Sequence, residues 1–480
     1  MIKKDKALKV QHISREYGSY LYTHNANKDT IRNTAISSLT ISKGYFSSKS
    51  QLICNLYTTT SNIYPSSHKT IITFVFVNTL MMMSKMRKVM IITVSIVAAL
   101  VLPVVLFMTL SPQFGGTANT VELNEYKQSP QHRNGKFANV GDVKVNMSGS
   151  NFWAMIKEQF NMHPNATPAS GPEVIPMDST SLANYNGDFR LFWFGHSSFL
   201  IQTNGKNILI DPMLGPSASP VPLVGVKRFN KQLPIKVEEL PEIDLILISH
   251  DHYDHLDYGS IIKLKDKTEA FYTPLGVGAH LESWGVDKHK IKELDWWQEI
   301  SFADMTFACT PAQHFSGRGK WFSDQASTLW CSWVIQTPEK NIFFSGDSGY
   351  GDHFKEIGVK YGPFDLAMME CGQYNELWKE IHMMPEETIM AGRDVRAQMV
   401  MPIHWGAFRL AMHDWLDPVT RATDKAIEIG MPVITPQIGE AFILNGEIPQ
   451  TAQWWKNGHA EQMLVKEASQ TPSNVEVQLD

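Results

Sequence analysis

The 480-residue chain has few cysteines and no large excess of charge of either sign. Its four cysteines are too few and too scattered for a disulfide framework or a cysteine-based zinc site. Lys and Arg together number 43 against 48 Asp and Glu, and this mild acidity argues against a nucleic-acid partner, which calls for a basic protein. Glycine and proline occur at ordinary frequencies and 43% of the residues are hydrophobic, so collagen-like and wholly disordered chains are excluded.

Residues 1–82 differ in composition from the rest of the chain. They contain ten Lys and Arg against three acidic residues, are rich in Ser, Thr, Asn and Tyr, and show no lasting amphipathic period. A targeting extension has this composition, and so does an upstream extension that is not part of the working protein. Met83 and Met86 would serve as alternative starts for the second case. We expect 1–82 to be a poorly ordered or dispensable N-terminal extension.

A long apolar run follows this extension. The 22 residues from Val89 to Leu110 carry no charge, and about 20 apolar residues in a helix span a bilayer. Three basic residues, Lys85, Arg87 and Lys88, precede the run, and no basic residue follows it closely. By the positive-inside rule, we expect an uncleaved transmembrane signal anchor over 85–112, with the domain that follows it on the non-cytoplasmic side.

The remaining chain alternates short β-branched and aromatic runs with helical patterns, which indicates an α/β architecture. We expect a linker and domain-packing segment over 113–185, one folded α/β domain over 186–445 and a C-terminal tail over 446–480. The predicted strands are 189–194, 199–202, 207–210, 244–249, 305–310, 332–336, 341–344, 366–370 and 399–403, and the predicted helices are 258–264, 276–284, 385–397 and 418–429.

A cluster of ligand-type side chains ends one of these strands. The apolar run Leu245–Ser249 leads into the pattern H-x-H-x-D-H over His250–His255. Imidazole and carboxylate groups suit zinc and similar divalent metals, and four such groups within six residues fit two ions side by side. A surface loop rich in His and Asp is the alternative, but ionisable groups against a core strand are costly unless something satisfies them.

Three later strands end in the same kinds of residue. His314, Asp347 and His404 follow the predicted strands 305–310, 341–344 and 399–403. A single histidine at a strand end is more often an ordinary surface residue. Because ligand sites in α/β proteins form at the carboxyl ends of strands, the three residues together with the motif predict one metal site.

These motifs resemble those of the metallo-β-lactamase fold hydrolases, and the neighbouring residues resemble the N-acyl-phosphatidylethanolamine-hydrolysing phospholipase D family. The likeness runs from about residue 133 to residue 439. It implies a four-layer αββα sandwich preceded by the transmembrane helix. The segments that carry the narrower likeness are Gly195–Phe199, Asp211–Pro212, Gln313–Arg318, Thr328–Trp330, Gly346–Tyr350 and Met401–Gly406.

The resemblance also implies a complete ligand set for two Zn²⁺ ions. Related di-iron redox proteins have Glu in place of the second motif His, so His252 favours zinc hydrolysis. One ion would be bound by His250, His252 and His314, the other by Asp254, His255 and His404, and Asp347 would bridge both.

The implied catalytic groups are Asp254, His382 and Arg318, acting with a metal-bridging hydroxide as the nucleophile. His382 would assist the leaving group, but a loop histidine without a role is an equal alternative. Arg318 would pair with phosphate through its planar guanidinium, or would make a structural salt bridge. Asp211 and His196 would support the ligands from behind.

The expected function is hydrolysis of N-acyl-phosphatidylethanolamine or a related phospholipid to phosphatidic acid and an N-acylethanolamine by a zinc-dependent phosphodiesterase. The alternatives are a metal-dependent lactonase or small phosphoester hydrolase, and a membrane-anchored metal-binding assembly factor without turnover, because fold and metals do not fix the substrate. The expected partners are a phospholipid substrate and the membrane, with no nucleic acid. An oligomer is compatible with the sequence, but no feature supports one.

Overall fold

The computed structural model describes residues 66–141, 143, 153–154, 157–158, 160–221, 225–319, 324–445 and 453–456. Most of the expected N-terminal extension and most of the expected C-terminal tail therefore lie outside the described residues. The chain divides into two compact units, Met1–Leu102 and Pro103–Asp480. The domain boundaries predicted above stay predictions.

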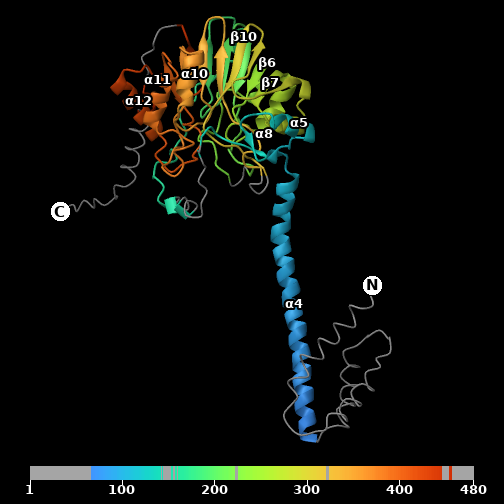
Figure 1. The fold of residues 1–480 in the computed structure, drawn as a ribbon. Helices are drawn as coiled ribbons and strands as arrows, with labels where there is room; N and C mark the ends of the chain where they lie inside the picture. The colour runs from blue at the N-terminus through green and yellow to red at the C-terminus, as the bar shows by residue number, and fades with distance from the viewer. Residues whose placement is uncertain are drawn as a thin grey trace, which may run out of the picture. The chain divides into compact units, whose positions relative to one another are not determined.

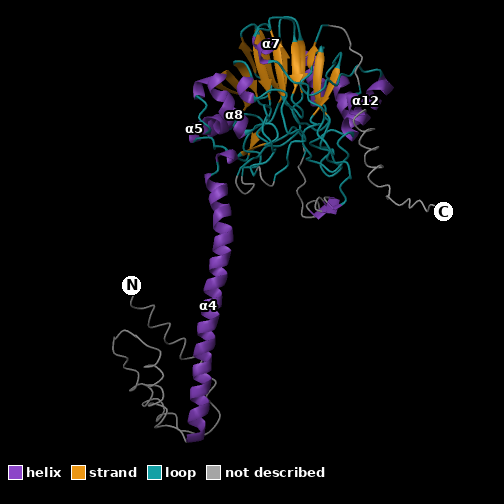
Figure 2. Cartoon of the chain, turned by 180° about the vertical axis from the view of Figure 1, so that it is seen from behind, coloured by secondary structure: helices purple, strands orange, loops and turns teal. Residues whose placement is uncertain are grey.

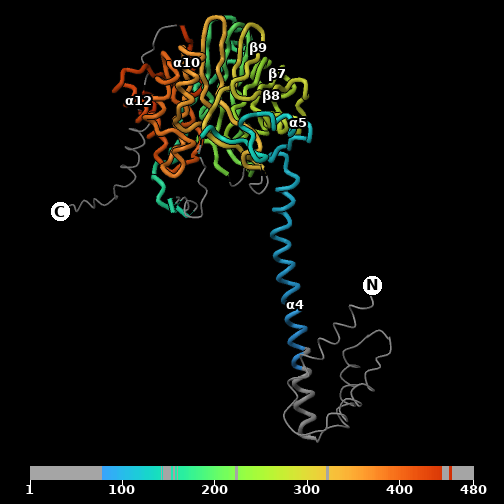
Figure 3. Tube along the Cα trace, viewed as in Figure 1, coloured from blue at the N-terminus to red at the C-terminus, as the bar shows by residue number. Residues whose placement is uncertain are grey.

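One long apolar helix is found in the described residues. Helix α4 (Ser66–Leu110; Figure 3) begins before residue 85, where the anchor was predicted to start. Its part Met81–Leu110 has a mean hydropathy of 2.9. Length and composition make this part a candidate membrane span. Pro103 lies inside the helix, which membrane helices tolerate.

The catalytic part contains a seven-stranded mixed sheet in the order β15-β3-β4-β5-β6-β7-β8. Strands β5, β6, β7 and β8 are parallel to one another, and the pairs β15–β3, β3–β4 and β4–β5 are antiparallel. The strands are β3 (Arg190–Trp193), β4 (Phe199–Thr203), β5 (Lys206–Ile210), β6 (Ile243–Leu247), β7 (Thr268–Pro274), β8 (Ile291–Leu294) and β15 (Ala441–Ile443).

A second mixed sheet has six strands in the order β14-β13-β12-β11-β10-β9. Strands β12, β13 and β14 are parallel, and the other neighbouring pairs are antiparallel. The strands are β9 (Glu299–Phe302), β10 (Met305–Thr310), β11 (Ser332–Gln336), β12 (Asn341–Phe344), β13 (Leu366–Glu370) and β14 (Val400–Ile403). A small hairpin of β1 (His132–Arg133) and β2 (Lys136–Phe137) lies outside both sheets.

Helices cover the outer face of each sheet, as Figures 1 and 2 show. Helices α8 (Tyr258–Leu264) and α9 (Gly278–Ser283) pack on the seven-stranded sheet, and α10 (His353–Tyr361), α11 (Pro385–Asp394) and α12 (Asp417–Ile429) pack on the six-stranded sheet. The short helices are η2 (Pro112–Phe114), α5 (Thr120–Tyr126), α7 (Ser179–Ala183), η3 (Val237–Glu239), η4 (Lys265–Lys267) and η5 (Lys288–Lys290).

Local sequence sets where these helices begin and end. Asp257 caps α8 by accepting a hydrogen bond from the Ser260 amide at 2.8 Å. Pro385 occupies the first turn of α11, where its missing amide proton costs nothing. Gly430 ends α12 with a left-handed φ of 70°, which glycine adopts without steric cost.

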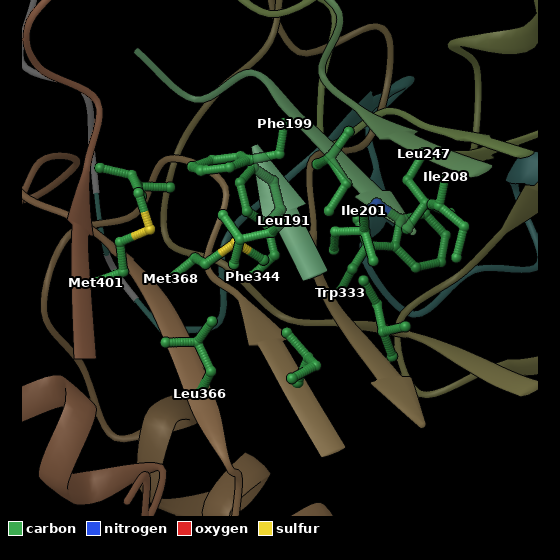
Figure 4. Packing of buried hydrophobic residues seen from close by; sticks show 14 of the residues in the cluster. Leu191, Phe199, Ile201, Ile208, Leu247, Trp333, Phe344, Leu366, Met368 and Met401 are labelled. Atoms are coloured by element: carbon green, nitrogen blue, oxygen red, sulfur yellow. The ribbon is translucent and has the colours of Figure 1, made fainter. Parts of the chain in front are cut away.

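The core lies between the two sheets. Leu191 and Trp193 of β3 face the opposite sheet, while Phe192 packs toward α8 and α9. This alternation follows from the two-residue period of a strand, and it explains why strands buried on both faces read as continuous apolar runs. Figure 4 shows Phe199 of one sheet and Phe344 of the other within this core, with ring centroids 6.3 Å apart. The layers confirm the expected αββα sandwich.

Candidate metal centre

The predicted ligands converge at the carboxyl ends of strands from both sheets. The turn His250–His255 follows β6 of the seven-stranded sheet. His314, Asp347 and His404 follow β10, β12 and β14 of the six-stranded sheet. All seven side chains are buried except that of His252, which is half-buried. The structure therefore brings together every residue that the sequence assigned to the metal site.

Three imidazoles form a first group. The Nδ1 atom of His252 lies 2.9 Å from Nε2 of His250 and 3.2 Å from Nε2 of His314. Oδ2 of Asp347 lies 3.9 Å and 3.8 Å from those two Nε2 atoms. Three nitrogens and one carboxylate oxygen this close together have the donor types of a four-coordinate zinc site.

A second group contains Asp254, His255 and His404. Oδ2 of Asp254 lies 3.5 Å from Nε2 of His255 and 3.2 Å from Nε2 of His404. Asp347 reaches this group as well, with Oδ1 at 3.1 Å from His255 Nε2 and Oδ2 at 3.1 Å from His404 Nε2. Asp347 thus contacts both groups, as a bridging ligand would.

Hydrogen bonds behind the ligands orient the rings. His255 Nδ1 lies 2.7 Å from Oδ2 of Asp211, whose other oxygen accepts a hydrogen bond from the Ser249 amide at 2.7 Å. His314 Nδ1 lies 3.0 Å from the Ile381 carbonyl oxygen. Each of these rings uses one nitrogen outside the cluster and presents the other to it. Metal-binding histidines in proteins are held in this way.

The electrostatics of the cluster favour a cation. Burial lowers the pKa of His314 well below its usual value. Burial is the largest influence on His404 and acts to lower its pKa, but the carboxylates of Asp347, Asp254 and Glu370 together raise that pKa well above the usual value. Burial would raise the pKa of Asp347, yet the neighbouring His255 and His404 lower it well below the usual range. The carboxylates therefore stay ionised among imidazoles.

Two of the potential ligand atoms have no hydrogen-bond partner among the described residues, which suits atoms that coordinate a metal ion. Nε2 of His255 and Oδ1 of Asp347 are buried and 3.1 Å apart, yet neither makes a hydrogen bond of acceptable geometry within the described residues. Buried polar atoms without a hydrogen-bond partner are rare and call for an explanation. Two ligands directed at a common ion would leave their atoms in this arrangement.

His196 belongs to the second group, although the sequence placed it only behind the site. Its Nε2 lies 2.8 Å from Oδ2 of Asp254. The amide of His404 donates to the His196 carbonyl, and the amide of His196 donates to the Trp405 carbonyl, so the two loops hold each other. Both histidines have a left-handed φ, 58° and 67°, which is uncommon outside glycine and concentrates at functional sites.

His382 lies beside the cluster and contacts a carboxylate that the sequence analysis missed. Its Nδ1 is 2.7 Å from Oε1 of Glu370, and its ring stacks on that of His404 at 5.5 Å and 11°. The His382 side chain is 13% exposed, whereas that of Glu370 is fully buried. A carboxylate ending the apolar strand β13 is the same signal that identified Asp347 and His404, and it would have found Glu370.

Arg318 differs from the expected phosphate contact. Its side chain is 2% exposed, and its guanidinium donates to the carbonyl oxygens of Asp251 at 2.8 Å and Leu256 at 2.7 Å. It also lies over the rings of Tyr253 and Trp284. Because Nη1 donates to both carbonyls, Arg318 supports the motif turn from behind, while its Nη2 is buried without a hydrogen-bond partner in the described residues. The structural alternative is therefore favoured, with carbonyl partners in place of a carboxylate.

Comparisons of the sequence with known proteins identify related families. Residues 206–405 match the β-lactamase superfamily domain. An uncharacterized protein of Mycobacterium tuberculosis is 38% identical over 338 residues, which are 69% of this chain and 88% of that protein. The N-acyl-phosphatidylethanolamine-hydrolyzing phospholipase D 1 of Caenorhabditis elegans is 32% identical over 259 residues, 51% of this chain and 72% of that protein. The mitochondrial N-acyl-phosphatidylethanolamine-hydrolyzing phospholipase D of Saccharomyces cerevisiae is 34% identical over 236 residues, 47% of this chain and 49% of that protein.

The matched domain includes all seven clustered residues, from His250 to His404. The fold, the cluster and the relatives agree with one another. The chain belongs to the metallo-β-lactamase superfamily and is a metal-dependent hydrolase of that fold.

Proposed function

We propose that the chain is a zinc-dependent phosphodiesterase of the phospholipase D type. It hydrolyses N-acyl-phosphatidylethanolamine or a related phospholipid to phosphatidic acid and an N-acylethanolamine. The observation that best supports a phosphodiesterase is the position of Asp347 between the two ligand groups, because such a residue can bridge two metal ions. The substrate class is supported by the names of the Caenorhabditis elegans and Saccharomyces cerevisiae relatives.

The chain's own side chains would hold the metals. His250, His252 and His314 would bind one Zn²⁺ and Asp254, His255 and His404 the other, with Asp347 shared. Two zinc ions would lower the pKa of a shared water and neutralise charge on the phosphoryl oxygens. Asp211 fixes the ring of His255 through its 2.7 Å contact and keeps Nε2 directed at the site.

His382 would act as the general acid that donates a proton to the leaving group. Its contact with Glu370 directs Nδ1 at that carboxylate, so the protonated form of the ring would carry a second proton on Nε2. The Nε2 proton of that form would pass to the oxygen of the departing N-acylethanolamine as the phosphorus–oxygen bond breaks. Its partly exposed ring stands next to His404, within reach of a substrate at the cluster.

The chain that follows α4 is linked to the metal-motif turn through Arg318. The Pro112 carbonyl accepts a hydrogen bond from Trp284 Nε1 at 2.7 Å, and the Gln113 carbonyl accepts one from Arg318 Nε at 3.1 Å. Arg318 also donates to two carbonyls of the turn. With α4 in the membrane, the segment after it would tether the hydrolase domain to the bilayer surface. The basic residues before the apolar run favour the non-cytoplasmic side.

The test is an assay of the full-length chain in detergent micelles containing N-acyl-phosphatidylethanolamine, with phosphatidic acid and N-acylethanolamine measured by mass spectrometry. Both products are expected, a chelator abolishes them, and zinc restores them. His382→Gln is expected to lower kcat about 10²- to 10⁴-fold, the usual contribution of general acid catalysis. His289→Ala, which removes an exposed histidine, is expected to change nothing.

Two results would overturn the proposal. Hydrolysis of a small bis-aryl phosphate without hydrolysis of the lipid would identify a small phosphoester hydrolase. Hydrolysis of neither substrate by zinc-loaded protein would favour a metal-binding assembly factor.

A further inference from the structure

A large cavity lies beside α8 and η3 and is separate from the metal centre. Its volume is about 770 Å³, and none of the seven clustered residues lines it. Leu214, Leu233, Ile235 and Val237 give it apolar surface. A cavity of this size accommodates part of an amphiphilic molecule.

The rim of this cavity is basic. Lys227, Lys231, Lys236 and Lys263 line it, together with the half-buried Arg228. Lys236 and Lys263 form ion pairs with the only acidic lining residues, the two glutamates of η3, at 2.8 Å and 2.9 Å.

Two of the lysines keep their charge free for a ligand. Lys227 and Lys231 are exposed and have no ion pair within the described part of the chain. Arg228 donates to the carbonyl oxygens of Phe194 and Gly215, so its charge is not offset by a carboxylate contact in the described residues. The rim therefore carries an excess of positive charge above an apolar floor.

A smaller cavity connects this region to the segment that follows α4. Its volume is about 220 Å³, and it shares Leu214, Val237 and Lys263 with the larger cavity. Gln113 also lines it. Gln113 follows the end of α4, at Leu110, by three residues, and a chain extends at most about 3.6 Å per residue. Gln113, on the wall of the smaller cavity, therefore lies within about 11 Å of Leu110, the last residue of the apolar helix.

We propose that the larger cavity binds an anionic phospholipid of the membrane in which α4 is anchored. The phosphate lies between Lys227 and Lys231, and part of an acyl chain lies on Leu214 and Leu233. Basic residues close to a bilayer attract anionic lipids, and each contributes severalfold to the affinity. A soluble anion would use the lysines but leave the apolar floor without a partner. This site is independent of the hydrolytic centre.

The test uses the full-length chain in phosphatidylcholine nanodiscs that contain a photoactivatable phosphatidylglycerol. Cross-links are mapped by mass spectrometry. We expect labelling of residues 227–239, and we expect the double variant Lys227→Gln/Lys231→Gln to reduce it about tenfold or more. The matched control Lys292→Gln/Lys355→Gln removes two exposed lysines elsewhere and should keep full labelling. The His404→Ala variant should also keep it, which separates this site from the proposed hydrolysis.

Three results would overturn the proposal. The first is equal labelling of the double variant and the control, with equal melting temperatures showing that both are folded. The second is equal labelling by a photoactivatable phosphatidylcholine, which would mean that the anionic headgroup is not recognised. The third is displacement by inorganic phosphate as effective as displacement by unlabelled phosphatidylglycerol, which would identify a site for a free anion.

Discussion

His255 Nε2 lies 3.1 Å from Oδ1 of Asp347, and the two residues come from different sheets. His255 lies in the turn after β6 of the seven-stranded sheet, and Asp347 follows β12 of the six-stranded sheet. The centre therefore forms only when both sheets pack against each other. Its integrity is coupled to the sandwich as a whole.

Replacing Asp347 is expected to disturb both ion sites. Among the residues that the structure describes, Asp347 is the only carboxylate that contacts both ligand groups, so in Asp347→Ala the zinc content should fall from two equivalents to fewer than one. Elemental analysis of the purified full-length chain measures this. The His289→Ala control should retain two equivalents, and a full zinc content in Asp347→Ala would contradict the bridging role.

Asp211 tests the support behind the ligands. The Asp211→Asn variant replaces a carboxylate oxygen that faces His255 Nδ1 and weakens the orientation of that ring. Loss of such a partner typically lowers metal affinity about 10- to 100-fold. Competition with a chromophoric chelator would measure the zinc affinity. Asp266→Asn, on an exposed carboxylate, is the matched control, and equal affinities would refute the orienting role.

A variant of Arg318 distinguishes a structural role of this residue from a role in substrate binding. In Arg318→Met the buried carbonyls of Asp251 and Leu256 lose their charged donor, and each unsatisfied buried group costs about 1–3 kcal/mol. The melting temperature should fall by about 5 °C or more. A phosphate-binding arginine would behave differently, since KM for the lipid would rise while the melting temperature stayed constant.

The raised pKa of the buried Glu293 should make the free energy of unfolding depend on pH. Burial raises its pKa from the ordinary 4.5 to about 7, although the hydroxyl of Tyr126 and the amides of Gly276 and Gly278 donate hydrogen bonds to it and lower that pKa. The folded state therefore holds a proton that the unfolded state has lost between pH 4.5 and 7. Its contribution to the free energy of unfolding is full below pH 4.5 and decreases as the pH rises to about 7.

The Glu293→Gln variant removes this titration. The loss of unfolding free energy across that window is on the order of 3 kcal/mol for the wild type. Thermal unfolding at several pH values should show the melting temperature of the wild type falling relative to that of the variant as the pH rises. Glu339→Gln, on the surface, should follow the wild type. Parallel pH profiles of wild type and Glu293→Gln would disprove the titration of Glu293.

The strands buried on both faces were the predictable part of the fold. β10, β11, β12 and β13 have the predicted bounds because their apolar runs are continuous and end sharply. β8 and β9 were missed, since they are short and carry polar residues on partly exposed faces. Helix α10 was missed as well, because it is only nine residues long and contains Gly358. Short amphipathic elements owe their structure to packing partners that a sequence does not show.

The ligands were predictable because each one follows the carboxyl end of an apolar strand, and these strand ends lie at the same edge of the sandwich. The contact of His196 with Asp254 depends on loop conformations, including left-handed φ values that no local pattern of these residues indicates. The position of Arg318 depends on Gln113, which is distant in the sequence. These features follow from tertiary packing.

A zinc titration of the chelated full-length chain, with N-acylethanolamine release as the readout, tests the central claim most directly. The binuclear arrangement around Asp347 predicts no release without zinc and a rise that reaches its plateau at two equivalents per chain. Release at full rate from the zinc-free chain, or a plateau at one equivalent, would contradict it.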